Sequence, residues 1–282
     1  MAITKKSDLN SLFNSIYEDS LFVARENNVM TGLVTNYSAT GWMSRIVPIY
    51  AQVTAQSVAE GVDFANPTTF SKSAQATFTP GEIMCQVTLT DIEIDTDPEN
   101  ARGNASIEMG NAIATKIDTD LVGLFTSLST DKGPGAGQTA TLAKFATAIS
   151  VLRYNKVPNP IHIVLHPYTW FDIWSELGQP AATKVLLGDI ANEALRSFFV
   201  GDWLAADWFT SANIAADASA DAISSIFNPQ AFAFDSRKAP TMEPERDASL
   251  RAWELNMSAG YAYGVFRGTY GVKYTADVTE PA

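Results

Sequence analysis

The two histidines of the chain, His162 and His166, are the first candidates for chemistry. In a β-strand, residues four apart share a face, so this pair could supply two ligands to a zinc-type metal site. The run between them is apolar, however, and no third ligand lies nearby in the sequence. We therefore expect histidines of the core or of a strand end, and a cytosolic metal-dependent hydrolase is the less favoured function.

Other reactive residue types are equally isolated. The single cysteine, Cys85, falls in an expected strand without a neighbour that would activate its thiol. Residues 133–139 are glycine-rich like a phosphate-binding loop, but they contain no lysine and follow a helix, so we expect a hinge. Alternating acids could bind a hard cation, although a solvated strand face is preferred; these are Asp91, Glu93, Asp95 and Asp97. The sequence thus predicts no enzyme, no cofactor and no metal site.

Two groups of side chains are instead candidates for contacts between subunits. The first group lies in a turn-rich stretch, residues 61–74, and consists of Asp63, Phe64, Phe70 and Lys72. The second group is a dense patch of mixed charge and consists of Glu243, Glu245, Arg246, Asp247 and Arg251. Closely mixed signs suit ion pairs between subunits, although exposed pairs contribute only about 0–1 kcal/mol each. A solvated charged loop explains the second group nearly as well.

Composition restricts the class of protein. The 282 residues are 46% hydrophobic and only 18% charged, which favours a chain that buries further surface in an oligomer. A formal net charge of −12 argues against sequence-independent binding to nucleic acid. One cysteine excludes an internal disulfide framework, and no signal peptide or membrane-spanning segment is visible. We expect a soluble, cytosolic, oligomeric protein.

A long helix over residues 97–130 is the element around which the chain is organised. Asp97-Pro98 has the pattern of a helix start, and small or apolar residues recur alternately three and four apart as far as Leu128. Such a helix is roughly 45–50 Å long. Extended runs at 45–58 and 76–95 precede it and predict one long hairpin, with a slip of register at Thr90-Asp91.

The remaining segments predict an arm, a compact unit and a terminal strand pair. Residues 1–40 combine a helical apolar repeat with a loop-like end. A helix at 142–152, a buried strand at 161–165 and a helix at 168–177 open an α+β unit. We expect strand at 198–204, a loop or turn at 212–225, and two strands around a turn at 267–269. Strands from 45–95 and 250–276 are expected to share a sheet on the long helix.

The order of these parts, and several short stretches of sequence within them, resemble those of one protein family. They are residues 87–91 (VTLTD), 113–118 (IATKID), 163–167 (IVLHP), 227–232 (FNPQAF), 243–247 (EPERD) and 263–267 (YGVFR). The chain resembles the major capsid protein of tailed double-stranded DNA bacteriophages, with the Hong Kong 97-type fold. The resemblance covers most of residues 40–276, as architecture more than as exact motif.

The resemblance implies an α+β fold divided into four parts: an N-terminal arm (1–44), an extended hairpin loop (45–95), a peripheral domain with the spine helix (96–138 and 235–282) and an axial domain (139–234). It also implies hexamers and pentamers of this chain that form the icosahedral head of the virion around double-stranded DNA, which is bound without sequence specificity. We therefore expect assembly in the host cytoplasm, with a separate scaffolding protein and a portal protein. A decoration protein is compatible with this assembly, and we expect no membrane to take part. Cross-linking through Lys72 is not predicted. The nearest rival is an encapsulin-like compartment shell with the same fold.

Overall fold

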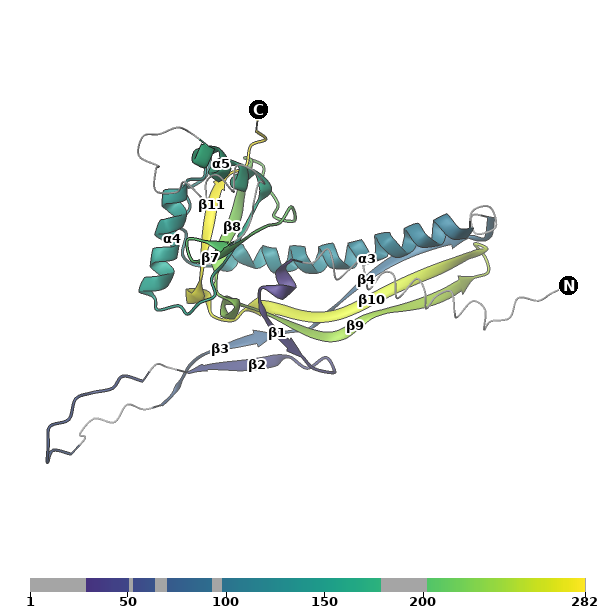
Figure 1. Ribbon diagram of the computed structural model, residues 1–282. Helices are drawn as coiled ribbons and strands as arrows, with labels where there is room; N and C mark the ends of the chain where they lie inside the picture. The colour runs from purple at the N-terminus through teal and green to yellow at the C-terminus, as the bar shows by residue number, and fades with distance from the viewer. Residues whose placement is uncertain (1–28, 51–52, 64–69, 93–97, 179–201, 282) are drawn as a thin grey trace.

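The computed structural model describes residues 29–50, 53–63, 70–92, 98–178 and 202–281. Figure 1 shows an elongated molecule with a compact unit at one end of a long helix and a long sheet, and a thin ribbon that leaves on the other side of the sheet. Helices and strands are mixed along the chain, and both parallel and antiparallel pairs occur. The α+β class expected from the sequence is confirmed.

The spine is helix α3 (Pro98–Gly123), which continues as a 3₁₀ helix, η2 (Leu124–Ser127). Its 26 residues make it about 39 Å long. The expected α-helix to Thr130 is wrong at its C-terminal end, because the last turn tightens into 3₁₀ geometry after Gly123. This change lets Phe125 and Leu128 enter the core beneath the compact unit, where both are buried.

A four-stranded sheet lies against α3. Its strands, in the order β1-β9-β10-β4, are β1 (Thr35–Ser38), β9 (Phe232–Asp247), β10 (Ala252–Val265) and β4 (Gly81–Thr90). One face of β4 and β10 packs on the spine through Leu89, Met109, Ile113, Leu255 and Met257. The expectation that strands from both ends of the chain share a sheet on the helix is thus confirmed for β4 and β10.

The expected hairpin is wrong in its second arm. Strand β2 (Arg45–Tyr50) pairs with β3 (Lys72–Phe78), whereas β4 leaves the ribbon and pairs with β10. Pro80 separates β3 from β4, and proline cannot donate a ladder hydrogen bond. The first strand also ends at Tyr50, since residues 53–58 have no regular secondary structure. The expected slip at Thr90-Asp91 is the end of β4.

The start of the described chain is more ordered than its sequence indicated. Residues 1–28, with the expected helical repeat of the arm, lie outside the described residues. The next residues form η1 (Met30–Gly32) and β1, where a loop was expected. Met30 is fully buried, and β1 runs parallel to β9. A four-residue strand gives too little alternation to be recognised from sequence.

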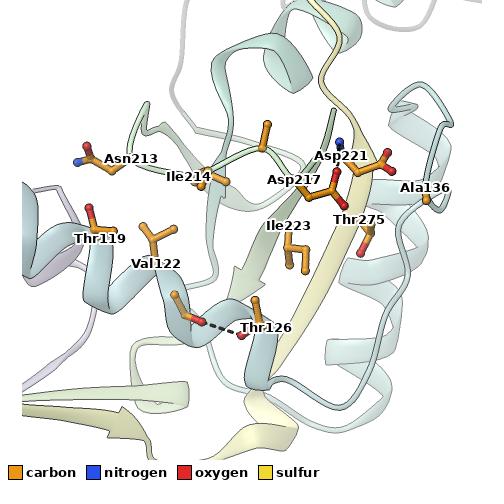
Figure 2. A pocket seen from close by; sticks show the side chains of 13 residues that line it. Thr119, Val122, Thr126, Ala136, Asn213, Ile214, Asp217, Asp221, Ile223 and Thr275 are labelled. Atoms are coloured by element: carbon orange, nitrogen blue, oxygen red, sulfur yellow. Dashed lines mark hydrogen bonds between the residues drawn. The ribbon is translucent and has the colours of Figure 1, made fainter. Parts of the chain in front are cut away.

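The spine meets the compact unit at an apolar junction to which several elements contribute side chains. Leu121, Val122 and Phe125 pack in one cluster with Val164, Phe227 and Phe232. A shallow cavity opens beside this cluster, between the end of α3 and residues 213–217 (Figure 2). The junction therefore joins parts that are far apart in the sequence.

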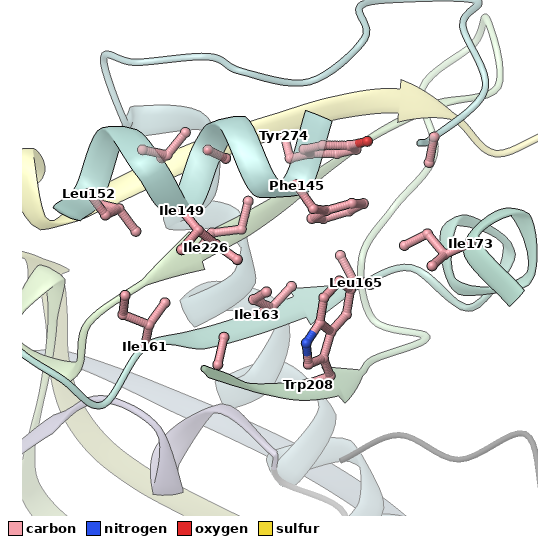
Figure 3. Packing of buried hydrophobic residues seen from close by; sticks show 14 of the residues in the cluster. Phe145, Ile149, Leu152, Ile161, Ile163, Leu165, Ile173, Trp208, Ile226 and Tyr274 are labelled. Carbon is pink, nitrogen blue, oxygen red and sulfur yellow. The ribbon is translucent and has the colours of Figure 1, made fainter. Parts of the chain in front are cut away.

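The compact unit is built on a five-stranded sheet flanked by α4 (Leu142–Tyr154) and α5 (Pro167–Gly178). Its strands, in the order β11-β8-β5-β7-β6, are β11 (Gly271–Asp277), β8 (Asp221–Phe227), β5 (His162–Leu165), β7 (Ala206–Thr210) and β6 (Asp202–Trp203). Figure 3 shows its core, in which Phe145 stacks on Tyr274 and Trp208 lies nearby. The two helices and the central strand β5 are confirmed.

Three expectations for this unit change. The loop at 212–225 is wrong, because β8 begins at Asp221; its residues are nearly all buried, so no alternation reveals the strand. Of the strand expected at 198–204, the structure describes only β6. Residues 198–201 lie outside the described residues, and Leu204 lies in a turn with φ +56°. The last two strands, β10 and β11, do not pair; β11 crosses to the compact sheet, past η5 (Gly268–Tyr270).

Candidate assembly surfaces

The ribbon formed by β2 and β3 carries the first group of candidate contact residues. Phe70 is 66% exposed and stacks on Tyr50 with ring centroids 4.7 Å apart. Lys72 opens β3, is exposed and donates a hydrogen bond to Gln75 of the same strand. Asp63 is exposed, and Phe64 lies outside the described residues. This end of the ribbon therefore presents aromatic and charged groups to solvent at a distance from the body (Figure 1).

The root of the ribbon, where β2 begins, holds a buried ionic cluster that sequence reasoning missed. The Asp235 carboxylate is fully buried and accepts hydrogen bonds from Arg45 Nε at 2.8 Å and Arg237 at 2.6 Å. The hydrogen bond from Arg45 to Asp235 is the main cause of the raised pKa of Arg45. Arg45 is the first residue of β2, so these contacts attach the ribbon to β9. Asp235 and Arg237 are two apart in a strand, which places them on one face, but the sequence does not indicate the third partner.

The mixed-charge patch forms a strand end and a turn, not the loop expected from the sequence. Glu243, Glu245, Arg246 and Asp247 belong to β9. Glu243 and Glu245 are exposed, and Glu245 lies opposite Glu254 of β10 in the antiparallel ladder. Like charges directly opposite each other are unfavourable in a sheet. This face of the sheet end is therefore acidic.

Arg246 is held within its own chain. Its guanidinium donates two hydrogen bonds to the Asp91 carboxylate, at 2.8 and 2.7 Å, and lies over the Trp253 ring at 5.5 Å. Of the four alternating acids, Asp91 thus pairs with an arginine. Glu93, Asp95 and Asp97 lie outside the described residues. The described residues therefore show Asp91 in an ion pair beyond the end of β4.

Asp247 and Arg251 shape the turn between β9 and β10. The Asp247 carboxylate accepts hydrogen bonds from the backbone N–H groups of Ser249 and Leu250 and from the Ser249 hydroxyl. These bonds, led by that from the hydroxyl, lower the pKa of Asp247. Arg251 has φ +51°, and its carbonyl accepts the Asp91 N–H at 3.0 Å. Both residues have a structural role in the turn, and the Arg251 side chain is exposed.

The structure keeps the two candidate groups apart. The turn between β9 and β10 lies at the far end of the long sheet, whereas the ribbon points away from the opposite end (Figure 1). The two groups therefore cannot form one site within a single chain.

The histidines have separate partners. His162 is buried with Nδ1 2.9 Å from Asp207 Oδ2, and its ring lies edge-on to Phe209 and Phe227. His166 follows β5, and its Nδ1 accepts the Tyr168 N–H at 3.2 Å. Among the described residues, no three His, Cys, Asp or Glu side chains could together hold a metal ion.

The cysteine and the glycine-rich segment are also structural. Burial raises the pKa of Cys85, which is opposite to what a reactive thiolate requires. The segment that starts at Gly133 runs along β11, where the Gly135 N–H donates to the Thr275 carbonyl and the Asp277 N–H to the Gln138 carbonyl. It is bound to the compact sheet and is not the free hinge expected. Within the described ranges, no helix is long and apolar enough to cross a membrane.

Comparisons with known proteins agree with this architecture. A family model described as phage capsid protein matches residues 86–274, and no curated protein matches the sequence. A structure from Mycobacterium phage Che8 aligns with a TM-score of 0.67 and 18% identity, covering 83% of this chain and 85% of that chain. The head structure of Helicobacter pylori bacteriophage KHP40 aligns with a TM-score of 0.70 and 11% identity, covering 87% of this chain and 88% of that chain. A virus-like particle from Pyrococcus furiosus aligns with a TM-score of 0.62 and 10% identity, covering 93% of this chain and 98% of that chain.

Proposed function

The chain belongs to the phage capsid protein family, and from this premise we propose how its copies assemble around a genome. Its fold is the Hong Kong 97-type capsid fold, and its function is structural: it is a major capsid protein of the virion. Self-assembly into a shell follows from that function. The contacts that drive assembly, the contents of the shell and its other partners are the subject of the proposal.

The observation that carries the proposal is the ribbon of β2 and β3 with residues 51–71 between them. Exposed apolar residues are concentrated there, and the described ones are Ile46, Tyr50, Val53, Val58, Val62 and Phe70. A two-stranded hairpin is only marginally stable in water by itself. We infer that this ribbon lies on a neighbouring copy, where its apolar side chains lose contact with water. Contacts of this head-to-tail kind close into rings and shells.

The charged turn between β9 and β10 is proposed as a second contact, at the local symmetry axes. The exposed acids Glu243 and Glu245 need a positive partner when copies meet, and Arg246 and Arg251 lie beside them. Because each subunit carries both signs, two copies can pair without other ligands. The contribution of each pair is small, about 0–1 kcal/mol, so repetition around an axis is what makes it effective.

We propose hexamers and pentamers that enclose double-stranded DNA, assembled in the host cytoplasm with a separate scaffolding protein and completed by a portal protein. The net charge of −12 suits a shell that leaves DNA free to pack, because it does not hold the phosphates. The parts then correspond to an extended loop (the ribbon), a peripheral domain (α3 with the long sheet) and an axial domain (the compact unit). A decoration protein is compatible with this assembly.

Particles purified from infected cells test the proposal against the encapsulin-like alternative. The proposal predicts closed shells of this chain that protect double-stranded DNA from nuclease. Shells that contain a protein cargo and no protected DNA would favour the alternative. A subunit that stays monomeric at all concentrations, with its ribbon against its own body, would contradict both.

A further inference from the structure

The shallow cavity at the end of the spine has a lining suited to apolar side chains. It has a volume of about 360 Å³ and lies between α3 and residues 213–217 (Figure 2). Thr119, Val122 and Thr126 line it from the helix, and Ile214 and Ile223 line it from the compact unit. This volume is at the lower end of the roughly 300–1,000 Å³ typical of ligand sites. It can take the side chains of about one turn of peptide, but not a whole helix.

The acids at the far end of the cavity are already engaged. Asp221 accepts the Gly137 N–H at 2.7 Å, and Asp217 accepts the N–H groups of Ser219 and Asp221 at 2.8 and 2.9 Å. Both carboxylates hold loops through backbone N–H groups, although Asp217 is exposed. An apolar segment of protein matches this lining.

The described chain begins beside this cavity. The Met30 N–H donates to Asp118 Oδ1 at 2.9 Å, and Asn213 Nδ2, whose residue lines the cavity, donates to Asp118 Oδ2 at 2.7 Å. Asp118 is fully buried and also accepts a hydrogen bond from the Ser211 hydroxyl at 3.1 Å. One carboxylate thus connects Met30, close to the start of the described chain, with Asn213, which lines the cavity.

The N-terminal segment has the complementary sequence. Residues 1–28 precede this anchor and carry an apolar repeat that ends in Leu21-Phe22-Val23. Phe22 precedes Met30 by eight residues, a reach of at most roughly 25–29 Å when extended. We propose that Leu21 and Phe22 of the same chain occupy the cavity between α3 and residues 213–217. The N-terminal arm would then be secured to its own subunit at this point, and its first residues alone would be available to neighbours.

Cross-linking of a cysteine pair tests this proposal in the full-length chain. Phe22→Cys and Thr119→Cys are combined in a Cys85→Ser background and treated with a short bifunctional maleimide. The matched control replaces Thr119→Cys by Thr115→Cys, which is exposed one turn earlier on α3 and does not line the cavity. We expect a cross-link within one chain at a yield at least tenfold above the control, identified as a monomer on a denaturing gel and by peptide mass.

Each other outcome would overturn the proposal. Cross-linked dimers would show that the arm of a second copy occupies the cavity, and equal yields in both pairs would show that the arm does not dock there. Protease sensitivity gives a second measurement. In a variant that combines Leu21→Asp with Phe22→Asp, we expect trypsin to cut after Arg25 at least tenfold faster than in the unchanged chain. An unchanged rate would contradict docking. Shell formation is scored separately, so this result is independent of the proposed assembly.

Discussion

The guanidinium of Arg246 grips both oxygens of the Asp91 carboxylate, at 2.8 and 2.7 Å, and so fastens the end of β9 to the residue that follows β4. The charged turn is therefore braced within its own subunit before any neighbour is met. Both side chains remain about 40% exposed, which leaves them accessible to another copy. Mutagenesis at this position has to separate the internal pair from contacts between subunits.

A charge swap makes this separation. Arg246→Glu places two negative groups together, and we expect fewer shells, with a loss that depends on salt concentration. The double variant Asp91→Arg with Arg246→Asp restores the internal pair but inverts its direction. It should recover the stability of the subunit without recovering assembly, as measured by urea unfolding and sedimentation. Lys144→Glu, an exposed change on α4, serves as the control for net charge. Recovery of normal shells by the swap would remove the charged turn from the proposed interface.

The Asp235 cluster predicts a large effect on stability. Asp235→Asn leaves Arg237, whose side chain is only 5% exposed, without its charge partner. We expect the free energy of unfolding to fall by about 3 kcal/mol, because removing one partner of a buried ion pair leaves an uncompensated charge. Urea unfolding measures this change. Glu82→Gln, which breaks the exposed 3.5 Å pair with Lys238, should cost less than about 1 kcal/mol; equal effects of the two variants would contradict the assigned role of Asp235.

Contact between the glycine-rich segment and β11 is tested at Gly133. A Cβ added to Gly133 would lie 2.2 Å from the Thr275 carbonyl oxygen, a backbone atom that cannot move aside cheaply. Gly133→Ala should lower the free energy of unfolding by about 1–3 kcal/mol. Gly123→Ala is the matched control, since its Cβ would meet nothing within 4 Å and alanine favours the helix by about 0.5–1 kcal/mol. Opposite signs are expected in thermal unfolding, and a harmless Gly133→Ala would show that the segment is free.

Stability should decrease in mild acid because of the histidines. Burial lowers the pKa of His162, against an opposing effect of Asp207, and burial also lowers the pKa of His166. As the pH falls below about 6.5, the unfolded chain binds protons before the folded chain does, so the free energy of unfolding declines. Urea unfolding between pH 7.5 and 5.5 measures this slope, and His162→Gln should flatten it. An unchanged slope in that variant would exclude His162 as a cause.

Helices and strands with a clear hydrophobic periodicity could be predicted from the sequence, whereas the pairing of strands distant in the chain could not. The stripe through Ala114 and Leu121 indicated the spine, and the apolar run at 161–165 indicated the central strand β5. The assignment of 76–95 to the second arm of the hairpin failed, because alternation indicates a strand but does not indicate the strand with which it pairs. Strand β8 was missed because both of its faces are buried.

The candidate site shows the same limit. Exposed aromatic and charged residues, such as Phe70 and Glu245, could be chosen from composition and turn signals. The internal partner of Arg246 could not, because Asp91 is 155 residues away in the chain. Asp118 and Asp235 were likewise not recognised, since a buried carboxylate is identified by its donors, and these come from distant segments.

Removal of the ribbon tip tests the account most directly. Residues 51–71 are replaced by Asn-Gly, a two-residue turn suited to a hairpin, so that Tyr50 and Lys72, already paired, are joined. Electron microscopy of the purified variant, with thermal unfolding to establish that it is folded, then gives the answer. The account predicts a cooperatively folded subunit that forms no closed shells. Shells of normal diameter from this variant would contradict the claim that the ribbon holds neighbouring copies together.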